Sequence, residues 1–241
     1  MPAKNSLQHR PVGDYDWTGL GDGLLEQGYG RLPRLLSVAQ CRQVSAYYDD
    51  PAIAFRKRIN MASHGFGRGE YKYFAYPLPD PVQALRKSLY PPLARIANQW
   101  NRHLRMEGNW PKTLPGFLRR CHQAEQRRPT PLMLSYQAGD YNCLHQDLYG
   151  EVYFPFQVIV LLSKPGRDFL GGELVLVEQR PRMQSRPQVV PMEQGDGIVI
   201  PVREKPRMGN RGYHRTQMRH GVSEIGKGGR LTLGIIFHDA A

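Results

Sequence analysis

Two histidines and one aspartate, His145, Asp147 and His220, are the side chains of this sequence best suited to hold a metal ion. In an extended strand, side chains two positions apart point to the same side, so His145 and Asp147 can reach one ion while Gln146 points away. His220 follows 73 residues later, which leaves room for several antiparallel strands to bring it back. Two neutral imidazoles and one carboxylate on one face bind Fe(II) and leave its other positions open. The pattern therefore predicts a mononuclear iron centre.

An arginine ten residues after the distal histidine, Arg230, begins a strand-like apolar run that extends to Phe237. In such a strand Arg230, Thr232 and Gly234 share one face, so the guanidinium is expected to point into the same interior as the metal ligands. A planar guanidinium binds a carboxylate through two parallel hydrogen bonds. The spacing predicts that Arg230 anchors a carboxylate ligand beside the metal.

The segment from Tyr136 to Asp147, YQAGDYNCLHQD, carries a family resemblance. It resembles the Tyr-x-x-Gly…Leu-His-Gln-Asp stretch of the AlkB-type nucleic-acid demethylases, which are Fe(II)- and 2-oxoglutarate-dependent dioxygenases. The likeness extends to Gly-Asp-Gly-Ile-Val-Ile at residues 195–200 and to the distal His220-Gly221. From about Tyr71 onward the chain is similar to a bacterial family of such oxygenases linked to oxidative repair of damaged nucleic acid.

This resemblance implies a cofactor, two cosubstrates and a reaction. His145, Asp147 and His220 would hold Fe(II), with 2-oxoglutarate and O2 as cosubstrates, and Arg230 together with Tyr136 would hold the far carboxylate of 2-oxoglutarate. The enzyme would hydroxylate a C–H bond and release succinate and CO2. On an N-methyl group, the hydroxymethyl product would lose formaldehyde, which amounts to oxidative demethylation of damaged nucleic acid.

The sequence also departs from the AlkB pattern. Ile236 stands where AlkB-type enzymes carry a second arginine, and Leu134 stands where they carry an asparagine, so the pocket for the 1-carboxylate end of 2-oxoglutarate is not reproduced. The Gly-Gly-Glu run at residues 171–173 is instead similar to a turn of prolyl-hydroxylase-like dioxygenases. An oxygenase acting on a protein, peptide or amino acid is therefore the alternative, and a metal-binding adaptor without turnover is a third reading.

Other histidines and cysteines compete for roles at the metal. His214 is a second candidate for the distal ligand, but only His220 has the Gly-Val continuation and the arginine at the family offset. His238 follows Arg230 by an even number of residues in the same predicted strand, so the two side chains would share a face. It is either a residue that supports the metal ligands without binding the metal or a histidine with a structural role. Cys121-His122 together with Cys143 and His145 are zinc-ligand types, although their spacing is not that of a zinc finger.

The excess of basic over acidic residues indicates which binding partners the chain favours. The chain has 33 Lys and Arg against 21 Asp and Glu, a net charge of +12 and a pI near 9.8, which attracts polyanions without fixing the fold. Arginines recur in residues 179–187 and 203–219, which we expect to be loops at a substrate rim. The aromatic segment Tyr71–Tyr76 either stacks bases beside Lys72 or fills a core. Nucleic acid is the favoured partner; the sequence does not determine the oligomeric state.

Cysteine usage and hydropathy bear on the compartment. Three cysteines without paired spacing argue against a disulfide framework and fit a reducing cytoplasm. The N-terminus has no apolar segment of signal-peptide length, and the longest aliphatic run, residues 158–162, is too short to span a bilayer. We expect a cytoplasmic protein with no membrane anchor.

Two helices and a series of strands must position the candidate site. Ser37 and Gln40 form a capping box for a helix running to about Tyr48, and Asp80-Pro81 offers an N-cap and a first-turn proline for a second helix, which Pro91-Pro92 breaks or kinks. From residue 132 onward, apolar runs separated by turns suggest a β-sandwich or jelly roll. These runs are residues 132–136, 157–162, 173–178, 188–192, 197–202 and 231–237.

The resulting fold class is α+β, with a double-stranded β-helix (jelly-roll) core and N-terminal helices packed on one sheet. A chain of 241 residues is long enough for one domain with a sizeable core. We expect a single oxygenase domain over residues 1–241. It would comprise an N-terminal extension (residues 1–30), a helix-rich support region (31–128) and the jelly-roll catalytic core (129–241).

Overall fold

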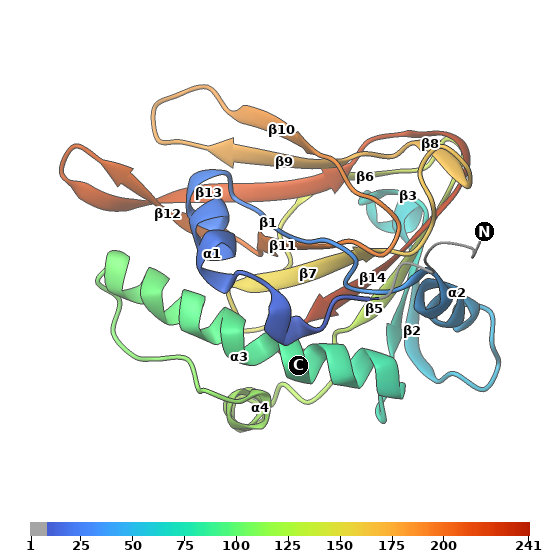
Figure 1. Ribbon diagram of the computed structural model, residues 1–241, viewed down its shortest axis with the longest axis horizontal. Coiled ribbons are helices and arrows are strands. Elements are labelled where there is room, and N and C mark those ends of the chain that lie inside the picture. Colours follow the sequence, from blue (N-terminus) through green and yellow to red (C-terminus); the bar gives the residue numbers. More distant parts are fainter. Residues whose placement is uncertain (1–8) are drawn as a thin grey trace, which may run out of the picture.

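A computed structural model describes residues 9–241, which fold into two mainly antiparallel sheets and a layer of helices (Figure 1). The larger sheet has the order β1-β11-β7-β14-β5-β4-β2, with β8 paired to β14, and the smaller has the order β10-β9-β13-β6-β3, with β12 paired to β13. The larger sheet comprises β1 (Gly30–Leu32), β2 (Phe55–Asn60), β4 (Glu70–Phe74), β5 (Leu132–Gln137), β7 (Phe156–Leu161), β8 (Phe169–Gly171), β11 (Gly197–Pro201) and β14 (Ile225–Ile236). The smaller comprises β3 (Gly67–Arg68), β6 (Tyr141–His145), β9 (Leu174–Gln179), β10 (Arg186–Val190), β12 (Glu204–Gly209) and β13 (Gly212–Val222).

Helices α3 (Asp80–His103) and α4 (Leu114–Gln123) lie on the side of the larger sheet that faces away from the smaller sheet (Figure 1). The described part of the chain also forms helices α1 (Trp17–Glu26) and α2 (Val38–Ala46), with short 3-10 turns at Val12–Asp14 and Met61–His64. The main hydrophobic core lies between α3, α4 and the larger sheet, where the rings of Trp100 and Phe156 meet edge to face at 4.6 Å. The predicted α+β jelly-roll with helices on one sheet is confirmed.

Helix starts and breaks agree only partly with the sequence. Ser37 and Gln40 form the predicted reciprocal capping box of α2. Helix α3, however, has Pro79 at its N-cap, and Asp80 lies in the first turn, where a carboxylate is stabilised by the helix dipole. Pro91 and Pro92 do not break α3, which continues to His103. Because Leu89, Leu93 and most of their neighbours are buried against the core, packing outweighs the roughly 3 kcal/mol cost of an internal proline.

All six predicted apolar runs are strands; five have bounds shifted by at most two residues, and β14 begins six residues earlier than predicted. The arginine-rich segment at residues 203–219, in contrast, is not a loop, because β12 and β13 pair as a hairpin along most of it. Along β13, buried Thr216, Met218 and His220 alternate with exposed Arg215 and Arg219. The sequence did not reveal this alternation because the buried face of β13 carries polar or sulfur-containing side chains instead of aliphatic ones. In the second arginine-rich segment, residues 180–185 connect β9 to β10 as predicted, whereas Gln179 ends β9 and Arg186 begins β10.

Residues preceding the helix-rich region pack onto the same sheets. Strand β1 adds an edge to the larger sheet by pairing with β11. The buried ammonium of Lys205, in β12, donates hydrogen bonds to the carbonyls of Leu25 (2.6 Å) and Glu26 (3.2 Å) at the end of α1. Lysine is well suited to this position because free carbonyls and the negative end of the helix dipole meet there.

Within residues 9–241, no helix combines the length and the apolar character that a membrane crossing requires. The three cysteines are free thiols: Cys41 and Cys121 are buried, and Cys143 is exposed.

Candidate metal centre

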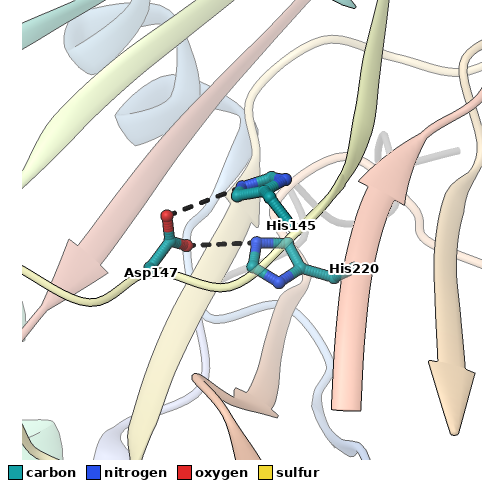
Figure 2. A group of neighbouring side chains, drawn as sticks. All are labelled: His145, Asp147 and His220. Carbon is teal, nitrogen blue, oxygen red and sulfur yellow. Dashed lines mark ion pairs between the residues drawn. The ribbon is translucent and has the colours of Figure 1, made fainter. Parts of the chain in front are cut away.

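His145, Asp147 and His220 meet between the two sheets, as predicted (Figure 2). His145 is the last residue of β6, and His220 is its cross-strand partner in β13. The centres of the two imidazole rings are 4.2 Å apart, and one potential ligand atom from each of the three residues lies within 4.8 Å of the others. The described residues contain no other such cluster of His, Cys, Asp and Glu.

Asp147 reaches the cluster by a route different from the one the spacing suggested. Strand β6 ends at His145, so Asp147 lies beyond the strand, and its carboxylate faces both imidazoles from one side (Figure 2). The side chain of Gln146 turns away from them, and its amide donates to the carbonyls of Arg203 (2.9 Å) and Met218 (3.0 Å). The two contacts tie the chain to β13 and to the residue that precedes β12, and they hold the turn that carries Asp147.

Each oxygen of the Asp147 carboxylate faces one imidazole. Nε2 of His145 lies 3.5 Å from Oδ1, and Nε2 of His220 lies 3.1 Å from Oδ2. Nδ1 of His145 is 2.8 Å from the carbonyl of Cys143, so this ring nitrogen carries the proton when the imidazole is neutral. Nδ1 of His220 is buried and has no hydrogen-bond partner within residues 9–241. Both Nε2 atoms therefore point at a common position beside the carboxylate.

The charges of the cluster suit a divalent cation. Burial would raise the pKa of Asp147, but its contacts with His145 and His220 outweigh burial and hold that pKa well below the ordinary value. Burial and the nearby His145 lower the pKa of His220. For His145, burial lowers the pKa, and the hydrogen bond and charge of Asp147 reverse this to a net rise. Deprotonated carboxylate and neutral imidazole are the forms that metals bind.

The cluster opens into a cavity of about 400 Å³, which has apolar walls and a few polar groups. Arg230 and Tyr136, the two residues predicted to bind 2-oxoglutarate, line this cavity together with the triad. Its apolar walls include Leu132, Leu134, Ile159, Leu174 and Val222. A cavity of this size and character is typical of a small-molecule site.

Arg230 is buried in this cavity without an anionic partner. Its side chain is 2 % exposed, it forms no ion pair within residues 9–241, and its Nε atom has no hydrogen-bond partner there. Burial lowers the pKa of Arg230, but a guanidinium keeps its proton in proteins. A buried, unpaired cation is costly, so this position calls for an anionic ligand.

Tyr136 is fully buried beside Arg230. The two residues are cross-strand partners in β5 and β14, and the guanidinium carbon lies 5.7 Å from the centre of the tyrosine ring. The Tyr136 hydroxyl accepts a hydrogen bond of 3.2 Å from Asn142, and burial raises the pKa of Tyr136 to about 12. The phenol is therefore protonated at neutral pH, and its proton is available to an acceptor in the cavity.

The competing candidates lie elsewhere. His214 is exposed on β13 and does not line the cavity, which leaves His220 as the distal histidine. Cys121 is buried in α4 and forms no metal-like cluster with Cys143 and His145, which excludes the zinc alternative among the described residues. His238 is also buried away from the cavity; its Nδ1 accepts from the backbone of Phe154 at 3.3 Å, and burial lowers its pKa to about 4.

The aromatic segment at residues 71–76 is mostly core. Tyr73 and Phe74 are buried, so their rings are not free to stack on bases. Tyr76 is exposed, and its hydroxyl is bound to Asp239 and Arg86. Only Tyr71 of this segment lines the cavity.

Two residues beside the triad could not be assigned from sequence. The hydroxyl of Tyr149 donates to Oδ1 of Asp147 at 2.7 Å, and the amide of Gln157 donates to Oδ2 at 2.6 Å. Gln157 is a polar residue in the otherwise apolar run of β7, which was the available signal, but nothing in the sequence fixed its direction.

Comparison with known proteins agrees with this geometry. Residues 69–240 match the model of a family described as an oxygenase catalysing oxidative methylation of damaged DNA. Uncharacterised proteins from two strains of Mycobacterium tuberculosis, CDC 1551 and H37Rv, are each 48% identical over 168 residues, which is 70% of this chain and 72% of theirs.

Solved structures share the fold at low sequence identity. A prolyl-4-hydroxylase from Pseudomonas putida matches with a TM-score of 0.54 at 12% identity, covering 93% of this chain and 100% of its own. A 2OG-Fe(II) oxygenase-family oxidoreductase from Burkholderia pseudomallei matches at 0.53 and 15%, covering 97% and 96%. The chain thus belongs to the oxygenase family matched by residues 69–240 and is an oxidoreductase with the fold of the Fe(II)- and 2-oxoglutarate-dependent oxygenases.

Proposed function

We propose that this protein is a dioxygenase in which His145, Asp147 and His220 bind Fe(II) while Arg230 and Tyr136 bind the far carboxylate of 2-oxoglutarate. The observation that carries the proposal is the placement of a buried, unpaired arginine in the same cavity as a His-Asp-His cluster. A metal site alone would fit many proteins, whereas a metal site with an anion anchor in the same cavity fits an acidic cosubstrate that also reaches the metal.

The donor set fits Fe(II). Two imidazole nitrogens and one carboxylate are the ligands of a non-haem iron site with open positions. The three side chains come from β6, the turn after it and β13, and they leave the side toward the cavity free for other ligands.

The cavity also fits 2-oxoglutarate, a dicarboxylate with a 2-oxo acid at one end. The far carboxylate would accept two hydrogen bonds from the Arg230 guanidinium and one from the Tyr136 hydroxyl. Thr232, buried on the same face of β14 as Arg230, also lines this space. Pairing would relieve the cost of burying the guanidinium, so the site is prepared for this ligand before it binds.

When bound, Fe(II) and 2-oxoglutarate supply the O2 chemistry, in which one oxygen atom enters succinate as CO2 leaves and the other enters a C–H bond of the substrate. The protein's residues orient the cosubstrate and keep the reacting centre away from bulk water. Leu134, Ile159 and Leu174 serve the second purpose by forming an apolar wall of the cavity.

For the substrate we propose alkylated nucleic acid, with hydroxylation of an N-methyl group followed by loss of formaldehyde. The description of the matched family and the net charge of +12 support this proposal. The Gly-Gly-Glu turn, on which the alternative of a protein or peptide substrate rests, also has a local role. A Cβ atom on Gly172 would lie 2.2 Å from Cδ1 of Ile225 and 3.1 Å from Cδ of Arg230, so the missing side chain leaves room for both residues.

Two hairpins offer phosphate contacts. Hairpins β9–β10 and β12–β13 extend beyond the rest of the molecule on the same side (Figure 1). Arg180 and Arg207 are tied to Glu178, and Arg215 to Glu204, so they serve the hairpins themselves. Among the residues of these two hairpins, the exposed arginines that form no ion pair within residues 9–241 are Arg182, Arg186, Arg211 and Arg219. We assign the phosphate contacts to this second group.

The proposal is tested by measuring succinate release from Fe(II)-loaded protein given 2-oxoglutarate and O2, with a methylated single-stranded oligonucleotide, its unmethylated counterpart or a proline-containing peptide. We expect stimulation by the methylated strand and none in His145→Ala. Affinity for the strand should fall with salt, and Arg211→Ala should reduce the slope of log K against log salt by about 1. Stimulation by the peptide alone, or salt-independent binding of the strand, would contradict the nucleic-acid assignment.

A further inference from the structure

The Asp147 carboxylate has a symmetrical set of neighbours. Oδ1 faces His145 and accepts a hydrogen bond from Tyr149, while Oδ2 faces His220 and accepts one from Gln157. Each oxygen therefore has one imidazole and one uncharged donor. The side chain is only 12 % exposed, so water does not substitute freely for these partners.

The two donors are held by different parts of the fold. Gln157 is 3 % exposed in β7, between Ile200 of β11 and Ile236 of β14, and its amide nitrogen also lies 3.2 Å from Nε2 of His220. It therefore approaches the cluster from the middle of the larger sheet.

Tyr149 contacts the other carboxylate oxygen, Oδ1, and lies on the segment that follows Asp147. Its ring packs edge to face on Tyr73 at 5.9 Å and lies 5.8 Å from the ring of His238. Because both of these partners are buried, the phenol is held in place independently of the carboxylate.

We propose that Tyr149 and Gln157 are positioning residues that fix the plane of the Asp147 carboxylate so that it binds the metal together with both histidines. The inference rests on the proposed iron site. Asp147 needs this support more than the histidines do, because it lies beyond the end of β6 and lacks a strand to orient it. Hydrogen-bond partners of a ligating carboxylate fix its orientation, and their loss typically costs about 10- to 100-fold in metal affinity.

Both donors are uncharged, which matters for a second reason. A lysine or arginine at either place would compete with the metal for the carboxylate charge, whereas a phenol and an amide orient the carboxylate without neutralising it. This choice of residue types explains why a buried polar glutamine is present in an apolar strand.

The test is a titration of the whole protein with Co2+ under anaerobic conditions, followed by calorimetry and by the visible spectrum of the bound ion. We expect Tyr149→Phe and Gln157→Leu each to weaken Co2+ binding by roughly 10- to 100-fold and to change the spectrum. Tyr47→Phe and Gln188→Leu are matched controls outside the cavity and should bind like the parent. Gln157→Asn, which keeps an amide but shortens it, should be impaired as well, and circular dichroism checks that each variant is folded.

A double-mutant cycle separates positioning from general structural support. In an Asp147→Ala background, neither Tyr149→Phe nor Gln157→Leu should weaken the remaining Co2+ binding further. Unchanged affinity in the single variants, or an equal loss in the Asp147→Ala background, would overturn the inference. If the parent itself bound no Co2+ at this cluster, the proposed iron site would fail with it, so the two failures are distinguishable.

Discussion

Arg230 and Tyr136 face one another across β14 and β5, with the guanidinium carbon 5.7 Å from the ring centre and no anion beside them within residues 9–241. The pair combines a fixed positive charge with a protonated phenol, since burial raises the pKa of Tyr136 to about 12. Together they form a polar, positively charged end of the cavity, opposite in character to its apolar walls.

Removing the guanidinium should weaken 2-oxoglutarate binding and leave metal binding intact. Losing one partner of a buried charged pair costs about 2–5 kcal/mol, or roughly 30-fold to several-thousand-fold in affinity. Anaerobic calorimetry of Arg230→Ala with 2-oxoglutarate and Co2+ measures both affinities. Arg167→Ala, which removes an exposed arginine, is the control. Equal 2-oxoglutarate affinity in Arg230→Ala and the parent would remove the basis for this assignment.

Replacing Gly172 should disturb the side chain of Arg230 and should also strain the backbone. Gly172 and Gly166 have φ values of +65° and +76°. A Cβ atom at Gly172 would lie 2.2 Å from Cδ1 of Ile225 and 3.1 Å from Cδ of Arg230, whereas one at Gly166 would meet nothing within 4 Å. Alanine at either position should lower the free energy of unfolding by about 1–2 kcal/mol or more, because L-residues disfavour this region. Gly172→Ala alone should also weaken 2-oxoglutarate binding by roughly 10- to 100-fold, through a displaced charged hydrogen bond. The same 2-oxoglutarate affinity in both variants would argue against contact with Arg230.

The His-Asp-His cluster was the part of the candidate site whose arrangement the sequence predicted best. The His-x-Asp pattern, the distant histidine and the arginine ten residues later fixed His145, Asp147, His220 and Arg230 as neighbours, because strand periodicity constrains which side chains share a face. The path to Asp147 was wrong, since β6 ends before it.

Contacts that depend on tertiary packing escaped prediction. Gln157 lies in a strand buried on both faces, where alternation gives no direction. The hairpin β12–β13 was missed because its inner face includes threonine, methionine, histidine and a buried lysine. Lys205 is buried only because the end of α1 and Glu178 both lie next to it. Such pairings between distant residues carry no local signal.

The buried pair Arg86–Asp239 should anchor the C-terminal segment. Nη2 of Arg86 lies 2.8 Å from Oδ1 of Asp239, and both side chains are 0 % exposed. Asp239→Asn leaves the guanidinium without its counter-charge, so we expect a loss of about 3–5 kcal/mol in the free energy of unfolding. Neutralising an exposed pair by Glu125→Gln should cost about 0–1 kcal/mol. Urea denaturation measures both; similar small losses would show that Asp239 is dispensable.

His238 should make stability depend on pH. Burial lowers its pKa from 6.5 to about 4, so the unfolded chain takes up a proton in a range where the folded protein does not. Stability is therefore fully present above about pH 6.5 and is lost as pH falls toward 4, by about 3 kcal/mol. In His238→Asn this part of the pH dependence should disappear. Parallel curves of unfolding free energy against pH for the variant and the parent would contradict the assignment.

The most direct test of the central claim is calorimetric titration of 2-oxoglutarate into the protein without O2, with and without Fe(II). The account predicts that Fe(II) strengthens 2-oxoglutarate binding in the parent and that this gain vanishes in His145→Ala, Asp147→Ala and His220→Ala, which retain Arg230. Binding of 2-oxoglutarate that is indifferent to Fe(II), or a gain that persists in all three variants, would show that the triad is not the metal site.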